Sequence, residues 1–147
     1  MDKQAIKGKR KARKLALQAL YQWLMTGGER TEIEAQFHAM NDMNKVDSAY
    51  FHHLLAGTIE SREEIENTLV QFLDREIDEI NPVELTVLRL SGFELMFCPE
   101  IPYRVVLDEA VTLSKSFGSQ DGHRYINGIL NNLARQVRSI EINQKNE

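Results

Sequence analysis

The chain has 147 residues, which suffices for one domain with a real hydrophobic core, and its apolar content of 42% and charged content of 27% are ordinary for a soluble protein. No apolar run approaches the roughly 18 residues that span a bilayer, and no apolar secretory segment follows the basic start. The single Cys98 excludes an internal disulfide and a multi-thiolate metal site, so we expect a cytoplasmic protein.

Charge is distributed unevenly along the chain. The first fourteen residues, MDKQAIKGKRKARK, hold seven basic side chains and one acidic, a net charge of +6. The other 11 basic and 21 acidic residues give positions 15–147 a net charge of −10. A cationic head on an acidic body favours a polyanionic partner that is contacted locally, nucleic acid first. The alternative is a flexible tail that only aids solubility.

Apolar residues recur with helical spacing through nearly the whole chain. The first helix begins within the basic head and ends at Thr26-Gly27-Gly28. Capping-box spacing at Thr31–Glu34 and at Ser61–Glu64 predicts the starts of two further helices. Between them, Asp47 is expected to cap a helix with Phe51 among its inward residues.

The second half of the chain carries the strongest helix signals. Asn81-Pro82-Val83-Glu84 places a capping amide, a first-turn proline and a third-position acid in order. Pro102 opens the next helix, and Gly118 is expected to end it in the left-handed conformation. Asp121 is expected to cap the last long helix, after which the polar residues from about 140 onward should fray.

These signals predict an all-α fold of about seven short helices and no β-sheet. We expect one domain over residues 1–147, built from two small helical lobes, 9–80 and 81–138, that share a core. The basic arm 1–11 and the tail 139–147 are expected to be flexible.

Catalytic and metal-binding patterns are poor. The four histidines lack paired metal spacing, and the neighbours His52 and His53 point to different faces of one helix. The acidic run 74–79 resembles the start of a calcium loop without its turn glycine and closing glutamate. No spacing pairs a nucleophile with a base. We therefore expect no enzyme, no cofactor and no metal.

A second segment, Lys115–Gly128, combines a helix end, a glycine-flanked turn and a helix start. Such a turn presents free backbone N–H groups, which bind anions. Its aromatic rings can stack on unpaired bases, and its arginine and amide can read base edges, which single-stranded RNA exposes. The alternative is that these residues only serve the core and the helix caps. If the segment binds RNA, we expect the basic arm and this turn to form one cationic groove.

Four stretches together span nearly all of residues 10–134: RKARKLALQALYQW, YFHHLLAG, NPVELTVLRLSGFEL and IPYRVVLDEAVTLSKSFGSQDGHRYINGILNNLA. In these stretches and their order, the chain resembles the NusB family of transcription antitermination proteins. The resemblance implies two small helical lobes without catalytic activity. It also implies binding of boxA-type single-stranded RNA in rRNA and leader transcripts together with a small-subunit ribosomal protein, NusE. With NusA and NusG, this pair promotes read-through by RNA polymerase.

The resemblance further implies which residues contact each partner. Those expected at RNA are Lys9, Arg10, Lys11, Arg13, Tyr21, Ser116, Phe117, Gly118, Asp121, Arg124, Tyr125 and Asn127. Glu84 and Arg89 are the candidates for contact with the ribosomal protein. A homodimer stays open, because related proteins differ in whether they dimerise.

Two other functions stay open from the sequence. One is a helical protein–protein scaffold whose basic tail is incidental. The other is an RNA-binding lobe related to rRNA methyltransferases, which is disfavoured because no cofactor-binding α/β pattern follows in the sequence.

Overall fold

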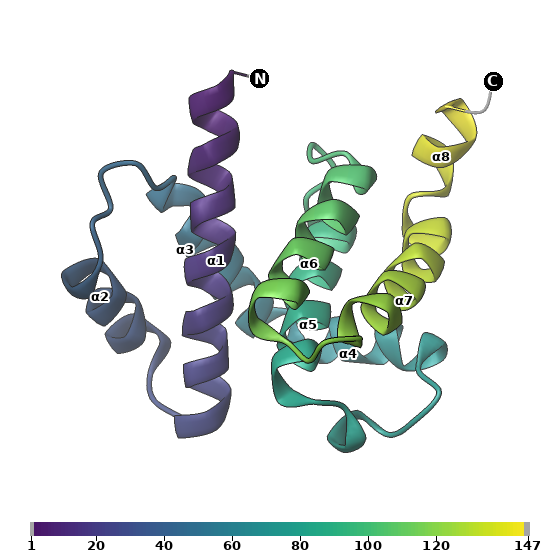
Figure 1. Cartoon of the computed structure of the whole chain (residues 1–147), viewed down its shortest axis with the longest axis horizontal. Coiled ribbons are helices and arrows are strands. Elements are labelled where there is room, and N and C mark those ends of the chain that lie inside the picture. Colours follow the sequence, from purple (N-terminus) through teal and green to yellow (C-terminus); the bar gives the residue numbers. More distant parts are fainter. Residues whose placement is uncertain (1, 146–147) are drawn as a thin grey trace. The chain divides into compact units, whose positions relative to one another are not determined.

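The computed structural model describes residues 2–145, and its regular elements over that range are all helical (Figure 1). Residues 1 and 146–147, which the sequence assigns to the flexible arm and tail, lie outside the described residues. The all-α prediction is confirmed. The chain forms two compact units, Met1–Glu60 and Ser61–Glu147. Over the described range, no helix has the length and apolar character that a membrane span requires.

The first unit consists of three helices, α1 (Lys3–Thr26), α2 (Arg30–Met40) and α3 (Ser48–Glu60). Both α2 and α3 pack against α1, and they also contact each other (Figure 1). As predicted, α1 ends at a glycine: Gly27 has φ of 73° and its N–H donates to the Trp23 carbonyl. The buried apolar side chains of this unit include Ala12, Ala16, Leu20, Phe37, Phe51, Leu54 and Leu55.

The predicted helix starts are correct where one side chain alone makes the cap. Asp47 Oδ1 accepts from Tyr50 N at 3.0 Å, and Asn81 Oδ1 accepts from Val83 N at 2.9 Å. The two capping boxes have different outcomes. The helix start predicted at Ser61 is correct, since Ser61 occupies the N-cap position of α4, but its side chain makes no capping hydrogen bond. The cap predicted at Thr31 is wrong, because α2 already begins at Arg30 and Thr31 lies inside the helix.

The second unit surrounds one buried helix, α5 (Pro82–Phe97), whose residues 84–95 are all buried. Three helices pack against it: α4 (Arg62–Leu69), α6 (Tyr103–Phe117) and α7 (Gly122–Val137). The helix α8 (Ser139–Lys145) follows α7, and two short 3₁₀ helices, η1 (Val70–Phe72) and η2 (Ile77–Glu79), lie between α4 and α5 (Figure 1).

Two helix ends beside the predicted turn differ from expectation. Gly118 follows α6 with φ of −93° and ψ of −170°, which is extended backbone and not the left-handed conformation. Asp121 occupies the N-cap position of α7 but makes no side-chain capping hydrogen bond. A contact from α5, described below, holds this turn instead.

The compact units divide at Glu60/Ser61, twenty residues before the lobe boundary expected from the sequence. The reason is that α4 packs against α5 and α7, and that Arg89 of α5 pairs with Glu66 of α4 at 2.6 Å. The segments expected to be flexible are also helical, since residues 3–11 form the start of α1 and residues 139–145 form α8. Asp2 supplies the cap of α1 by accepting from Ala5 N at 2.7 Å.

Arg138 forms hydrogen bonds at the carboxyl end of α5. Its buried guanidinium donates to the carbonyl oxygens of residues 94, 95, 98 and 101 over 2.8–3.1 Å. It also pairs with Glu141 of α8 at 2.6 Å, and Glu141 accepts from Tyr103 N at the start of α6. One side chain therefore binds four carbonyl oxygens at and beyond the helix end, two of which, those of Glu94 and Cys98, also accept a backbone N–H.

We predict that Arg138→Lys lowers the free energy of unfolding by about 2–4 kcal/mol, because an ammonium group has too few donors for these carbonyls and each unsatisfied buried group costs about 1–3 kcal/mol. Urea denaturation followed by circular dichroism measures the loss. The exposed Arg135→Lys is the control and should stay within about 0.5 kcal/mol of the parent. Equal stabilities for the two variants would contradict this role of Arg138.

Candidate nucleic-acid interface

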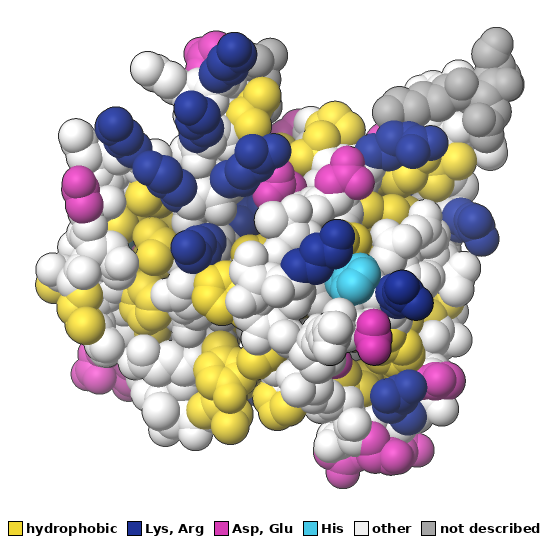
Figure 2. Space-filling view, viewed as in Figure 1, with side chains coloured by type: hydrophobic (Ala, Val, Ile, Leu, Met, Phe, Trp, Pro, Cys, Tyr) yellow, Lys and Arg dark blue, Asp and Glu magenta, His cyan; other side chains and the backbone are white. Residues whose placement is uncertain are grey.

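The basic residues of α1 form a stripe along one face of the helix. At 100° per residue, positions 3, 7, 10, 11 and 14 fall within about 100° of one another. All five are cations and all five are exposed, and positions 18 and 21 continue the same face. We call this surface the α1 stripe: Lys3, Lys7, Arg10, Lys11, Lys14, Gln18 and Tyr21. Figure 2 shows the lysine and arginine side chains gathered over the amino-terminal half of α1.

Two residues expected in the RNA contact instead face α3. Lys9 pairs with Asp47 at 2.9 Å, and its Nζ lies 4.7 Å from the centre of the Tyr50 ring. Arg13 is buried, with its guanidinium carbon 5.6 Å from the same ring. Such cation–π contacts stabilise the folded unit. The predicted contact of these two side chains with RNA stays a prediction, but their geometry assigns them to the α1–α3 packing.

The cationic stripe opposes the stability of its own helix. Like charges spaced four residues apart, such as Lys3 and Lys7 or Lys7 and Lys11, destabilise a helix by about 0.2–0.5 kcal/mol a pair. Cations in the first turns also oppose the helix dipole at a cost of about 0.3–1 kcal/mol each. Packing against α3 offsets these costs, so the stripe is not explained by the stability of α1 itself.

In the second unit, the carboxylate of Glu84 holds the turn between α6 and α7. Its Oε1 accepts from Ser119 N at 3.3 Å and from the hydroxyl of the same serine. Gly122 fits against this carboxylate so closely that a Cβ there would overlap it. A buried acid at the start of α5 therefore fixes the shape of the turn, which we call the 116–121 turn.

The residues predicted around this turn divide by exposure. Ser116, Asp121, Arg124 and Asn127 are exposed, while Phe117, Gly118 and Tyr125 are half-buried. Arg124 and Asn127 are three residues apart on α7 and share a face of it. One cation and one amide are thus presented together, next to a turn of fixed shape.

The Tyr125 ring is occupied within the unit. Its hydroxyl donates to Asp74 Oδ1 at 3.0 Å, and the Arg75 guanidinium lies 4.3 Å from the ring centre. Burial, reinforced by the bond to Asp74, raises the pKa of Tyr125, while hydrogen bonds from Arg75 and then Tyr125 lower the pKa of Asp74. Because Arg75 covers part of the ring, a base that stacks on Tyr125 must use the rest of its surface or displace Arg75.

The two residues expected at a protein partner both have partners inside the second unit. Glu84 is buried against the 116–121 turn, and Arg89 is buried against Glu66. Burial lowers the pKa of Arg89, and Glu66 opposes that effect. Their contact with a protein partner stays a prediction, and the structure assigns them to positioning the turn and α4.

Sequence reasoning omitted four cations from the predicted contacts that the structure places beside them: Lys3, Lys7 and Lys14 in the α1 stripe and Arg75 over Tyr125. Extending the helical period back through the basic head would have included the three lysines. Nothing in the sequence places Arg75 on a ring fifty residues away. The single cationic groove expected from the arm and the turn stays a prediction, because each surface lies on its own unit.

The part of the chain that the structure describes contains no group of three histidine, cysteine or acidic side chains able to hold a metal ion.

The fold and the site define a class of protein: an all-α protein with a cationic first helix and a polar turn held by a buried acid. Residues 10–135 match the model of the NusB family. The chain belongs to the NusB family.

Comparisons with individual proteins agree. The chain is 61% identical, over the full length of both chains, to the transcription antitermination protein NusB of Legionella pneumophila (strain Corby). Among solved structures, it is similar to T. maritima NusB, with a TM-score of 0.77 and 25% identity over 86% of this chain and 90% of that one. It also shares the fold of a structure of antitermination factors NusB and NusE in complex with dsRNA, with a TM-score of 0.76 and 24% identity over 86% of this chain and 96% of that one.

We predict that the Lys9–Asp47 pair stabilises the first unit near neutral pH and is lost in acid. The hydrogen bond from Lys9 lowers the pKa of Asp47 below its ordinary value of 3.8. A depressed folded-state pKa contributes stability above that ordinary value and loses it as the pH falls through the depressed one. The variant Asp47→Asn keeps a capping side chain for α3 without the charge. Its deficit in unfolding free energy should be present at pH 7 and shrink below about pH 4; a deficit independent of pH would contradict the assignment.

A pair of glycine substitutions on α7 tests the support of the 116–121 turn. Gly122→Ala should lower the free energy of unfolding by about 1–3 kcal/mol, because the new methyl group overlaps the Glu84 carboxylate. Gly128→Ala is the matched control: a Cβ there meets no atom within 4 Å, so the variant should gain about 0.5–1 kcal/mol of helix stability. Thermal and urea unfolding of both variants measure the difference, and equal shifts would show that Glu84 does not constrain the turn.

Proposed function

We propose that the protein is a transcription antitermination factor that binds boxA-type single-stranded RNA in rRNA and leader transcripts. Membership of the NusB family and 61% identity to a transcription antitermination protein over the full chain support this function. The main observation in its support is the α1 stripe, a helix face that presents five exposed cations together.

The proposed mechanism divides affinity from sequence preference. Phosphates are neutralised by the α1 stripe, which supplies charge without base readout. Bases are contacted by Arg124 and Asn127 on α7 and by the aromatic side chains Tyr21 and Tyr125, because amides and arginines read base edges and rings stack on unpaired bases. The acidic remainder of the chain repels other stretches of RNA.

We propose that a small-subunit ribosomal protein, NusE, binds together with this chain. A structure that shares this fold holds NusB and NusE in complex with dsRNA, and a basic ribosomal protein would be attracted to the −10 charge of residues 15–147. The complex would act on RNA polymerase with NusA and NusG, in the cytoplasm. We propose no catalytic role and no cofactor for the chain.

The two surfaces are tested by charge-removing variants, one on each unit. For single strands, each neutralised phosphate contributes about 0.7 to the slope of log affinity against log salt, or about fivefold in affinity at 0.1 M salt. Lys11→Gln should lower the slope by about 0.7 for a boxA-type RNA, whereas Arg124→Gln should weaken binding of the boxA-type RNA by about 1–3 kcal/mol and binding of a scrambled RNA by less. Fluorescence anisotropy titrations at several salt concentrations, with and without the ribosomal protein, measure these slopes.

The exposed Arg104→Gln, in the first turn of α6, removes the same charge outside both surfaces and serves as the control. It should leave the slope unchanged. The result that would overturn the proposal is equal affinity for boxA-type and scrambled RNA in the presence of the ribosomal protein. A full effect of Lys11→Gln with none of Arg124→Gln would confine RNA to the first unit and refute the two-surface mechanism.

A further inference from the structure

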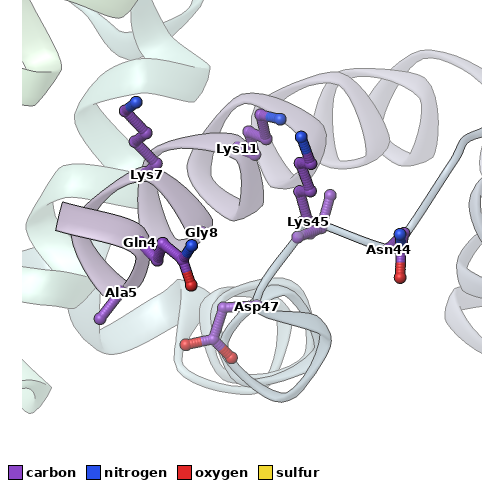
Figure 3. A pocket seen from close by; sticks show the side chains of 9 residues that line it. Gln4, Ala5, Lys7, Gly8, Lys11, Asn44, Lys45 and Asp47 are labelled. Carbon is purple, nitrogen blue, oxygen red and sulfur yellow. The ribbon is translucent and has the colours of Figure 1, made fainter. Parts of the chain in front are cut away.

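A cavity of about 470 Å³ lies between the start of α1 and the loop that precedes α3 (Figure 3). Both walls belong to the first unit. The residues that line it are Gln4, Ala5, Lys7, Gly8, Lys11, Asn44, Lys45, Val46 and Asp47. The loop thus adds one lysine to the two that the α1 stripe contributes.

The three lysines of the cavity are exposed, and none of them forms an ion pair with a carboxylate of residues 2–145. In Figure 3 the amino groups of Lys7, Lys11 and Lys45 lie on one side of the loop backbone, and the Asp47 carboxylate lies on the other. That carboxylate is already paired with Lys9 at 2.9 Å and accepts from Tyr50 N. The net charge presented to the cavity is therefore positive.

The loop is held against α1 by backbone contacts. Asp47 N donates to the Gly8 carbonyl at 3.1 Å, and the backbone of the loop lies in van der Waals range of Gly8. The position of Lys45 opposite Lys7 and Lys11 is thus set by the fold.

The lining favours a phosphate group over a base. No aromatic ring lines the cavity, so it offers no stacking surface, whereas three ammonium groups and the amides of Gln4 and Asn44 supply donors. Lysine binds phosphate as a point charge, without the bidentate geometry that reads bases. These features match the repeating phosphates of a nucleic-acid backbone.

We propose that this cavity binds backbone phosphate of the RNA that the α1 stripe contacts, and that Lys45 is an RNA-binding residue outside α1. The proposal rests on the proposed function and extends it from the face of one helix to a cationic cleft. The RNA backbone passes between α1 and the 44–47 loop, and Lys45 contributes to affinity without contributing to sequence preference.

The test compares Lys45→Gln with Lys45→Arg and with the control Arg104→Gln, using a boxA-type RNA and its scrambled counterpart. Lys45→Gln should lose about fivefold in affinity at 0.1 M salt and about 0.7 in salt slope, because one phosphate contact is lost. The loss should be equal for both RNAs. Lys45→Arg should retain the parent affinity and slope, and Arg104→Gln should change neither. Circular dichroism verifies that the variants are folded.

A second measurement locates the contact on the RNA. Single methylphosphonate substitutions remove one backbone charge at a time, and one position should lower the affinity of the parent protein while leaving that of Lys45→Gln unchanged. If the parent protein prefers boxA-type RNA but Lys45→Gln and Arg104→Gln bind it equally well, the proposed role of Lys45 is overturned while the proposed function stands. Loss of inorganic phosphate binding in Lys45→Gln without any change in RNA affinity would overturn it as well. Absence of boxA preference in the parent would instead overturn the proposed function.

Discussion

The second unit depends on how the polar groups of a buried helix are satisfied. Residues 84–95 of α5 are enclosed, so each charge and each terminal carbonyl on this helix needs a partner from a neighbouring element. Glu84 holds the 116–121 turn, Arg89 holds α4 through Glu66, and Arg138 holds the carboxyl end. Apolar packing brings the helices together, but these three contacts determine where the turn, α4 and α8 lie along α5. The buried polar groups thus connect the core directly to the candidate site.

In the first unit, the main feature is the positive charge of α1 and how much of it has partners in the fold. This helix carries more positive charge than helix stability favours, and two of its inward-facing cations have partners within the unit. Lys9 is paired with Asp47, and Arg13 lies against the Tyr50 ring, so the inward charges support the packing of α3. The exposed Lys7 and Lys11, by contrast, form no ion pair with a carboxylate of residues 2–145. Their arrangement on one face, continued by Tyr21, is the reason why a polyanionic partner explains them better than solubility does.

Several features of the fold and the site were predictable because they depend on residues close in sequence. Gly27, Asp47 and Asn81 mark helix boundaries through their own backbone or side-chain chemistry, and each was placed correctly. The capping box at Thr31 failed because its spacing also fits the interior of a helix, whereas Ser61 does occupy an N-cap position. Arg75 on the Tyr125 ring and Lys45 beside Lys7 and Lys11 were not predictable, since each joins elements that are distant along the chain.

The sequence by itself determined that the chain is helical throughout, that its charge is concentrated at one end, and that its motifs are those of the NusB family. These properties follow from local periodicity and composition, which need no knowledge of the packing. The tertiary structure decided which cations face solvent and which are neutralised, and it assigned α4 to the second unit. It also showed that Glu84, a candidate for contact with a protein partner, accepts hydrogen bonds that hold the 116–121 turn. Only packing settles such questions, because burial and pairing depend on which distant residue comes to lie opposite each side chain.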